Sequence, residues 1–499
     1  MGIDALRIEV QCDVSGGLPL FHVVGLPEKE VSESRERIRS AIKNSGLQFP
    51  AGRITANLAP ADVRKEGVGF DLPIAVAILV ASGQIPPLDE DLCLVGELAL
   101  DGEVRGVRGV LPIAAEAASA GMIVPLANGV EAAVGSQGPV YPVRSLDEAR
   151  RFLCREIEIA PFAVDCDELM RECTEDIRHD MAEVRGQMQA KRAIEVAAAG
   201  GHNLLMIGPP GSGKSLMARC LPEILPPMSF DEALEVTRIY SIAGLLDGPS
   251  LVGRRPFRAP HQTISYAGMV GGGHGVPGPG EISLAHHGVL FLDELPEFDR
   301  RVLETLRQPL EDRTVLLSRA GVSVRYPSSF TLIAAMNPCP CGYLGDALKP
   351  CVCSLVDVRR YRKRLSGPFL DRIDLFVEVP RLSVEDLFHA RPADGSDAIR
   401  RRVSDARRRQ WDRLASEQDC HSNAQLDGEA LERHCPLEED ASLLLQRAVA
   451  RFALSARAHV RILRVARTIA DLDRTDDLSA AHVAEAIRYR TAGESLGEH

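Results

Sequence analysis

Long hydrophobic runs are absent from this sequence of 499 residues. The longest apolar stretch, residues 72–81, is far shorter than the ~18–20 residues that a membrane-spanning helix requires. The N-terminal residues also lack a basic segment followed by an apolar one, so no secretory signal is expected. We therefore expect a cytoplasmic protein without membrane spans. Its length exceeds what a single core organises, which predicts several domains.

Lysine is scarce, with seven lysines against 51 arginines, and the net charge is −12. An acidic chain of this kind does not coat nucleic acid with its whole surface. It can still concentrate positive charge in a channel. The strongest local exception is residues 398–413, where seven arginines stand against two aspartates.

Twelve cysteines in a chain without a secretory signal do not indicate a disulfide framework, because the cytosol keeps thiols reduced. Eight of them are scattered and suit small core or surface residues. The other four form two Cys-x-Cys pairs, which are Cys339 with Cys341 and Cys351 with Cys353. Four thiolates can hold Zn²⁺ tetrahedrally, although Cys-x₂₋₄-Cys is the commoner spacing. The alternative is a loop with four free thiols.

The distribution of apolar residues predicts an α/β protein of several domains. Residues 1–162 alternate short strands with helices, and the polar residues 163–183 suit a linker. Residues 184–380 alternate buried strands with helices, as a domain with a parallel sheet does. Residues 381–499 contain helical patterns only and predict a helical bundle.

The strongest motif is a glycine-rich loop that fits G-x-x-x-x-G-K-[ST] between a predicted strand and a predicted helix. Its backbone N–H groups and the helix N-terminus favour phosphate. Lys214 would reach the β- and γ-phosphates of a nucleotide, and the Ser215 hydroxyl would ligate Mg²⁺. A plain glycine-rich turn is the alternative. The predicted cradle consists of Gly208, Pro209, Pro210, Gly211, Ser212, Gly213, Lys214 and Ser215.

Two further motifs follow predicted buried strands. Asp293 and Glu294 end the run Gly288-Val-Leu-Phe-Leu, and the carboxyl end of a parallel strand is where ligands bind. Asp293 would hold Mg²⁺ through water, and Glu294 would orient or deprotonate an attacking water. Asn337 directly follows the run 330–336. It can hydrogen-bond the γ-phosphate or that water, although Asn-Pro often only starts a turn.

Four arginines are candidates for contacts with phosphate. Arg372, in Ser366-Gly-Pro-Phe-Leu-Asp-Arg-Ile-Asp, can act in trans on the γ-phosphate of a neighbouring subunit, the alternative being a salt bridge to Asp371 or Asp374. Arg457, at the start of a helix, can touch the phosphate of its own subunit, the alternative being a solvated helix face. Residues 316–327 alternate around a glycine and predict a β-hairpin. A basic, glycine-rich insertion at 254–275 precedes it, and such loops can face a central pore. The hairpin carries Arg319 and Arg325.

Together these segments resemble the YifB/ComM family of magnesium-chelatase-like AAA+ ATPases, and the resemblance covers essentially the whole chain. It is carried by GPPGSGKS, RPFRAPHQTIS, GVLFLDELPEF, AAMNPCPCG, SGPFLDRID and SARAHVRILRVARTIADL. The resemblance implies a hexameric ring with a helix-2 insert and a pre-sensor hairpin. It also implies that Asn337 is sensor 1, Arg372 the arginine finger and Arg457 sensor 2. ComM-type members are understood as DNA-translocating ATPases that drive branch migration during natural transformation.

Residues 1–162 resemble the Lon-protease-type domain, but they lack its catalytic dyad. Gly69 stands where the serine of the K-D-G-P-S motif would be, and Ile113 falls at the lysine position. A peptidase is therefore not expected. A role of this domain as a scaffold or a DNA-contacting collar is more consistent with the missing dyad. Two other activities remain open, a chelatase-type ATPase that acts through a partner subunit and a regulatory ATPase that remodels a protein. An aromatic gripping residue would favour the latter, whereas the predicted pore loops contain Arg, His and Gly, which suit phosphate.

Overall fold

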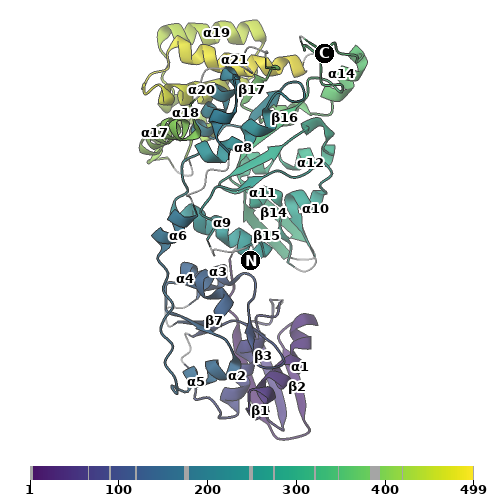
Figure 1. Ribbon diagram of the computed structural model, residues 1–499, viewed down its shortest axis with the longest axis vertical. Coiled ribbons are helices and arrows are strands. Elements are labelled where there is room, and N and C mark those ends of the chain that lie inside the picture. Colours follow the sequence, from purple (N-terminus) through teal and green to yellow (C-terminus); the bar gives the residue numbers. More distant parts are fainter. Residues whose placement is uncertain are drawn as a thin grey trace.

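The computed structural model contains an N-terminal domain at one end of its long axis, with a parallel sheet and a helical C-terminal region beside each other at the other end (Figure 1). It is a mixed α/β chain, as the sequence predicts. No helix among the described residues is long and apolar enough to cross a membrane. The structure describes residues 4–27, 29–63, 65, 67–88, 92–117, 121–173, 179–246, 251–273, 276–319, 322–346, 348–382, 394–417 and 420–497.

The N-terminal domain contains two three-stranded sheets and a short two-stranded one. In the first sheet, the central strand β3 pairs antiparallel with β1 and parallel with β2. The apolar stretch 72–81 forms most of helix α2, which is buried in the core of this domain. A helix that is apolar on nearly all sides must be buried in this way. The elements are β1 (Glu9–Ser15), β2 (Leu20–Val24), α1 (Lys29–Asn44), β3 (Arg53–Ala59), α2 (Asp71–Ala81), β4 (Cys93–Leu94), β5 (Glu97–Leu98), β6 (Val104–Arg105), α3 (Val110–Glu116), β7 (Met122–Pro125), α4 (Gly129–Gly135), β8 (Val140–Val143) and α5 (Leu146–Leu153).

The predicted linker, 163–183, includes helix α6 (Cys166–Glu172). Val164, Leu169 and Met170 pack on a cluster of buried apolar residues from α3, α4 and helix α9 (Phe230–Ala243). Ser241 of α9 donates a hydrogen bond of 2.5 Å to the buried carboxylate of Glu131 on α4. The N-terminal domain therefore contacts the central domain directly, and the linker is part of that contact.

The central domain is built on a five-stranded sheet of order β10-β13-β16-β9-β17, and each neighbouring pair is parallel. Strands β9, β13 and β16 are buried on both faces, so they are nearly continuous runs of apolar residues. In β9, Leu204 and Met206 pack on one face of the sheet, and Leu205 and Ile207 pack on the other. The strands are β9 (Leu204–Ile207), β10 (Phe257–Arg258), β13 (Val289–Leu292), β16 (Thr331–Met336) and β17 (Leu375–Glu378).

Helices and insertions surround this sheet. The predicted hairpin 316–327 corresponds to β14 and β15, which pair antiparallel with Leu316 opposite Arg325. The Tyr326 hydroxyl donates to the carbonyl of Pro277, 2.8 Å away, which joins the hairpin to the segment just after the glycine-rich insertion. The remaining elements are α7 (Met188–Gly200), α8 (Lys214–Ile224), α10 (Tyr266–Val270), β11 (Gly271–Gly272), β12 (Gly278–Pro279), α11 (Glu281–Leu284), α12 (Arg300–Thr305), α13 (Pro309–Asp312), β14 (Thr314–Arg319), β15 (Val322–Pro327), α14 (Leu355–Arg362) and α15 (Gly367–Leu370).

After β17, the described residues form helices and no named strand. These helices pack against α7, α8 and β17, and they share one apolar core with one face of the sheet. The helical C-terminal region therefore lies against the central domain, as Figure 1 shows in yellow and green. Its helices are α17 (Ser396–Leu414), α18 (Gly428–His434), α19 (Glu439–Phe452), α20 (Ala456–Leu472) and α21 (Ala480–Gly497).

Candidate functional site

Three of the predicted motifs meet at the carboxyl edge of the parallel sheet. The glycine loop follows β9, Asp293 follows β13 and Asn337 follows β16. Met336 is in register with Ile207, and Leu292 is in register with Ala334, so the three strands end at nearly the same level. Ligands of open α/β sheets bind outside this edge.

The backbone of the glycine loop needs its glycines. Gly211 and Gly213 have φ values of +76° and +92°, which residues with a Cβ rarely adopt. At Gly208 a Cβ would lie 2.0 Å from the carbonyl oxygen of Val379. The loop then enters α8 at Lys214. The free N–H groups at the start of a helix attract anions, so this loop can hold phosphate.

Lys214 is buried beneath this loop. Its Nζ donates to the carbonyl oxygens of Gly208 and Pro209, at 2.7 and 2.9 Å, and lies 3.5 Å from Asn337 Oδ1. These acceptors are all uncharged. Burial lowers the pKa of the Lys214 ammonium, against the opposing effect of the Asp293 and Glu294 charges. A phosphate group would supply the counter-charge that such an ammonium favours.

The Ser215 hydroxyl donates a hydrogen bond of 2.6 Å to Oδ2 of Asp293. Hydroxyl and carboxylate oxygens are the protein ligands that Mg²⁺ takes beside nucleotide phosphates. The donor set at this position, with Ser215 after β9 and Asp293 after the next strand but one, therefore fits Mg²⁺. The two residues lie 78 positions apart in the sequence, and the sheet brings them together.

Glu294 is exposed and has a left-handed backbone, with φ 51° and ψ 46°. Its N–H donates to Oδ1 of Asp293, 2.9 Å away. A residue with a Cβ in this conformation costs about 1–3 kcal/mol, and such strain gathers at functional sites. A carboxylate beside the cradle can orient water and accept its proton.

Asn337 lies where the sequence predicts it, at the tip of β16 beside Lys214. The backbone of Asn337 lies close to the Tyr361 hydroxyl on α14. Burial raises the pKa of Tyr361 to about 12, so the hydroxyl stays protonated at neutral pH. Sequence reasoning missed Tyr361, because nothing in its spacing distinguishes it from an ordinary helix residue.

Arg372 lies at the opposite edge of the sheet, just before β17. The Arg372 carbonyl accepts from the Asn203 side chain at the start of β9. Its guanidinium donates to the carbonyl oxygens of Arg307 and Pro368 and forms an ion pair of 2.6 Å with Glu311. Only 9% of the side chain is exposed. The ion-pair partner is thus Glu311 and neither Asp371 nor Asp374, the two partners that the sequence suggested.

Those two aspartates are occupied by other arginines. Asp374 is buried and pairs with Arg461 of α20, which keeps its pKa well below the usual range despite the burial. Asp371 pairs with Arg490 of α21 at 3.4 Å. These pairs join the C-terminal helices to the amino edge of the sheet. The sequence could not assign them, because each links residues that are about 90 to 120 positions apart.

Arg457 also lies at the amino edge, 3.9 Å from Asp371, with 67% of its side chain exposed. Together with Arg372 it lines a cavity of about 1230 Å³, whose lining does not include the described residues of the glycine loop. The expected contact of Arg457 with the phosphate site of its own chain is therefore not made in this structure. The reason is that the first turns of α20 are held at Asp374, at the far edge of the sheet.

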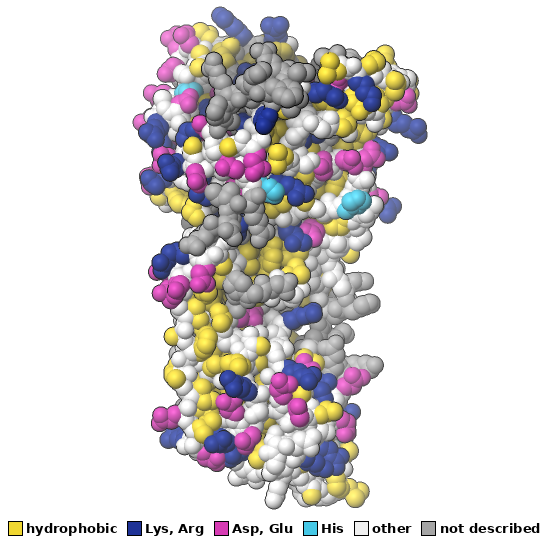
Figure 2. Space-filling model, in the orientation of Figure 1, with side chains coloured by type: hydrophobic (Ala, Val, Ile, Leu, Met, Phe, Trp, Pro, Cys, Tyr) yellow, Lys and Arg dark blue, Asp and Glu magenta, His cyan; other side chains and the backbone are white. Residues whose placement is uncertain are grey.

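Of the two candidate DNA contacts, Arg319 and Arg325, the structure describes the side chain of Arg325. Arg325 is exposed on β15, between the buried residues Val324 and Tyr326. The Arg319 side chain lies outside the described residues. On the face shown in Figure 2, basic and acidic side chains are interspersed.

The arginine-rich segment 398–413 is not a free basic surface. Arg400, Arg402, Arg408, Arg409 and Arg413 each pair with a carboxylate. Arg407 is half-buried and donates to the carbonyl of Ala198, and burial lowers its pKa to about 10. Most of this basic run is therefore neutralised within the chain.

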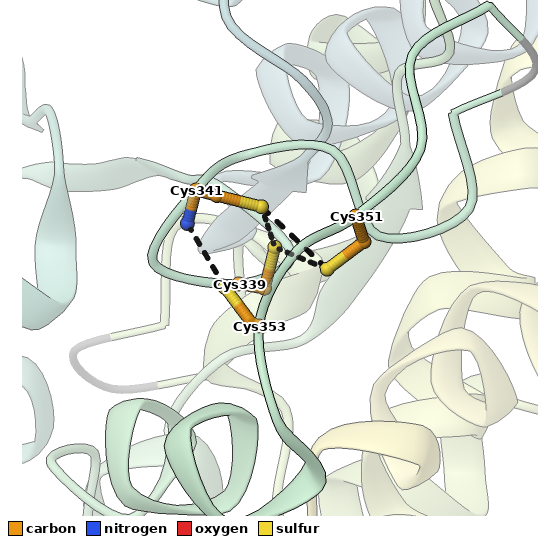
Figure 3. Close-up of side chains that lie close together, drawn as sticks. All are labelled: Cys339, Cys341, Cys351 and Cys353. Carbon is orange, nitrogen blue, oxygen red and sulfur yellow. Dashed lines mark hydrogen bonds between the residues drawn. The ribbon is translucent and has the colours of Figure 1, made fainter.

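Two groups of potential metal ligands occur in the described part of the chain. One consists of the four clustered cysteines, whose sulfur atoms gather in one loop (Figure 3). The other is Glu235, His286 and His287. His286 Nδ1 accepts from the N–H of Ser329, so its Nε2 carries the proton and donates to Glu235, 2.9 Å away. A protonated nitrogen does not ligate a metal, so this second group is a hydrogen-bonded cluster.

Comparison with known proteins agrees with this arrangement. A family model described as magnesium chelatase, subunit ChlI, matches residues 180–387. Models described as subunit ChlI of Mg-chelatase and as the subunit ChlI C-terminal match residues 10–128 and 393–490. The magnesium-chelatase 67 kDa subunit of Heliobacterium mobile is 28% identical over 254 residues, which are 44% of this chain and 37% of that protein.

Other relatives match over nearly the full length. The protein YifB of Salmonella typhimurium is 45% identical over 502 residues, covering 99% of this chain and 96% of that protein. The competence protein ComM of Haemophilus influenzae is 42% identical over 499 residues, covering 98% of this chain and 96% of that protein. With its glycine loop, its parallel sheet and these matches, the chain belongs to the YifB/ComM family of magnesium-chelatase-like proteins.

Proposed function

We propose that this protein is a cytoplasmic AAA+ ATPase that hydrolyses ATP with Mg²⁺ and translocates DNA as a hexamer, as a branch-migration helicase in recombination or natural transformation. The observation that carries the proposal is the placement of its charged groups. The phosphate cradle lies at one edge of the parallel sheet, and the candidate arginine finger lies at the other. A single chain therefore cannot complete its own site.

The residues around the cradle would have separate roles in binding and hydrolysis. The glycine loop and Lys214 would bind the β- and γ-phosphates, and Ser215 with Asp293 would hold Mg²⁺. The metal would neutralise charge that develops on the phosphates. Glu294 would orient the attacking water and accept its proton, while Asn337, beside Lys214, would fix the γ-phosphate or the same water.

Arg372 and Arg457 would act on the nucleotide of a neighbouring subunit. They line one cavity at the amino edge, and Arg457 is exposed there. In a ring, the amino edge of one subunit can face the carboxyl edge of the next. Arg372 must then exchange its ion pair with Glu311 for the phosphate, and because Glu311 is 53% exposed the pair is partly screened and weak enough to exchange.

The DNA substrate is supported by a relative and by a surface. A full-length relative is named a competence protein, which connects this family with DNA uptake. The β14–β15 hairpin presents the exposed Arg325, and it leads through β16 to Asn337. Hydrolysis at the cradle can therefore move the hairpin through one strand. The principal test is ATPase activity with and without single-stranded and four-way-junction DNA, where stimulation by either DNA is expected.

The alternative is a magnesium-chelatase-like or regulatory ATPase that remodels a protein partner. It is favoured by the matches to magnesium-chelatase subunits. That protein would hydrolyse ATP at an unchanged rate when DNA is added. Unchanged ATPase activity with both DNA substrates would therefore reject the DNA motor and favour a protein partner.

Replacing Arg325 with alanine is expected to weaken DNA binding several-fold and to a similar degree for different sequences, because an interaction with phosphate carries no sequence information. The salt dependence of binding should flatten by about 0.7–0.9 in log–log slope for each phosphate that the protein no longer neutralises. Arg451→Ala, which removes an exposed arginine from α19, is the control and should leave both quantities unchanged. An equal effect of the two variants would mean that only net charge matters.

A further inference from the structure

The four clustered cysteines lie in the loop between β16 and α14, and the proposed ATPase chemistry does not use them. Cys339 Sγ lies 3.4 Å from Cys341 Sγ and 3.6 Å from Cys351 Sγ, and Cys341 Sγ lies 3.5 Å from Cys351 Sγ. Cys353 Sγ accepts from the Cys341 N–H, 3.4 Å away. Figure 3 shows the three sulfur atoms of Cys339, Cys341 and Cys351 pointing toward one another.

These three distances are close to the edges of a coordination tetrahedron, and all four sulfur atoms lie within 4.8 Å of one another. Zn–S bonds of about 2.3 Å place the sulfur atoms of a tetrahedral site about 3.8 Å apart. A disulfide requires about 2.05 Å and joins sulfur atoms in separate pairs. Here the sulfur atom of Cys339 lies near two others, which is typical of ligands around a common centre.

The backbone around the cluster also suits thiolates. The N–H of Cys341 donates to the Cys353 sulfur, and backbone groups of Tyr343 and Val352 lie close to the Cys341 sulfur. Hydrogen bonds from the backbone stabilise the charged form of a sulfur ligand. Between the two pairs, Asp346 accepts from the N–H groups of Leu348 and Lys349, which closes the loop that brings the pairs together.

We propose that Cys339, Cys341, Cys351 and Cys353 bind one Zn²⁺ ion per chain as a structural site. Four thiolates complete the tetrahedron and leave no position for water, so the metal has no catalytic role. The histidines of the described structure are not needed as ligands. Thiolates also discriminate against Mg²⁺, so the two metals would occupy separate sites.

The metal would hold the phosphate cradle in shape, a consequence that rests on the proposed function. Cys339 follows Asn337 by two residues, and the hydroxyl of Tyr361, on the helix after Cys353, lies close to the Asn337 backbone. Gly342 packs on the glycine loop, because a Cβ at Gly342 would lie 2.7 Å from Pro210 Cδ. One metal ion would therefore fix both the segment at Asn337 and the segment at Gly342 that packs on the glycine loop.

The test is the metal content of the full-length protein, purified under reducing conditions and measured by elemental analysis. One zinc per chain is expected, with Cys351→Ser and Cys353→Ser losing it and Cys166→Ser, outside the cluster, retaining it. Replacement of Zn²⁺ by Co²⁺ in the unmutated protein should give the absorption spectrum of a tetrahedral thiolate site. Absence of zinc, iron bound in its place, or disulfides within the cluster would each overturn the proposal.

The consequence for the cradle has its own measurement. Zinc removal by a chelator should weaken binding of a nucleotide analogue by up to about tenfold, as when one hydrogen bond is misplaced. Zinc addition should restore it. Unchanged affinity in a protein shown to have lost zinc would reject the bracing role. A protein with one zinc per chain that binds no nucleotide would instead reject the proposed ATPase and leave the metal site intact.

Discussion

Lys214→Ala is expected to abolish measurable nucleotide binding, whereas Glu294→Gln should bind ATP normally and hydrolyse it far more slowly. Lys214 is buried with uncharged acceptors only, so a phosphate is its natural counter-charge. Loss of one partner of a buried charged pair costs about 2–5 kcal/mol, which weakens binding at least about 30-fold. Equilibrium titration with a fluorescent nucleotide measures this effect.

Glu294→Gln keeps the shape of the side chain and removes its ability to accept a proton. Loss of a general base costs about 10²–10⁴-fold in rate. The matched control is Glu297→Gln, three residues further along, where the exposed carboxylate pairs with Arg364. Normal hydrolysis by the Glu294 variant would show that this carboxylate is not the base. Melting temperatures of all three variants exclude unfolding as the cause.

Arg372→Ala is expected to retain ATP binding and ring assembly and to lose hydrolysis by about 10³–10⁵-fold, the usual contribution of an arginine finger. The physical reason is that charge on the transferring phosphoryl group is then not neutralised. Arg400→Ala, which removes a partly exposed arginine paired with Asp397, should have no effect. ATPase rates and sedimentation of the purified rings measure both properties.

Two experiments separate action in trans from a structural role of Arg372. Mixing Arg372→Ala with Lys214→Ala subunits creates interfaces with one intact cradle and one intact arginine, so partial recovery of ATPase activity is expected. Glu311→Gln breaks the ion pair of Arg372 and leaves the arginine in place. It should remain active. Inactivity of Glu311→Gln, with no recovery in verified mixed rings, would reduce Arg372 to a structural ion pair.

The strands and their polar ends were predictable because their signals are local. A buried parallel strand is a short apolar run, and the glycine loop has a fixed spacing before its helix. The alternation of residues 316–327 likewise predicted the hairpin that β14 and β15 form. In each case, neighbouring residues in the chain determine the conformation.

The arginine partners were not predictable in this way. Glu311 pairs with Arg372 across 61 residues, and the helical C-terminal region takes Asp371 and Asp374 for its own arginines. The same limitation applies to residues 398–413, which look basic in sequence, because three of their arginines pair with distant carboxylates. An ion pair depends on a few ångströms of separation between side chains, and sequence spacing does not determine that separation.

The sequence by itself determined the family, the α/β class and the candidate residues for binding phosphate and metal, because these follow from motifs and periodicity within short segments. Only the tertiary structure decided how those residues are distributed. It brings Lys214, Ser215, Asp293 and Asn337 together at one edge of the sheet, and it holds Arg372 and Arg457 at the other. The physical reason is strand order, since parallel strands far apart in the chain align their ends, and the packing of α20 on Asp374 places Arg457 away from the cradle.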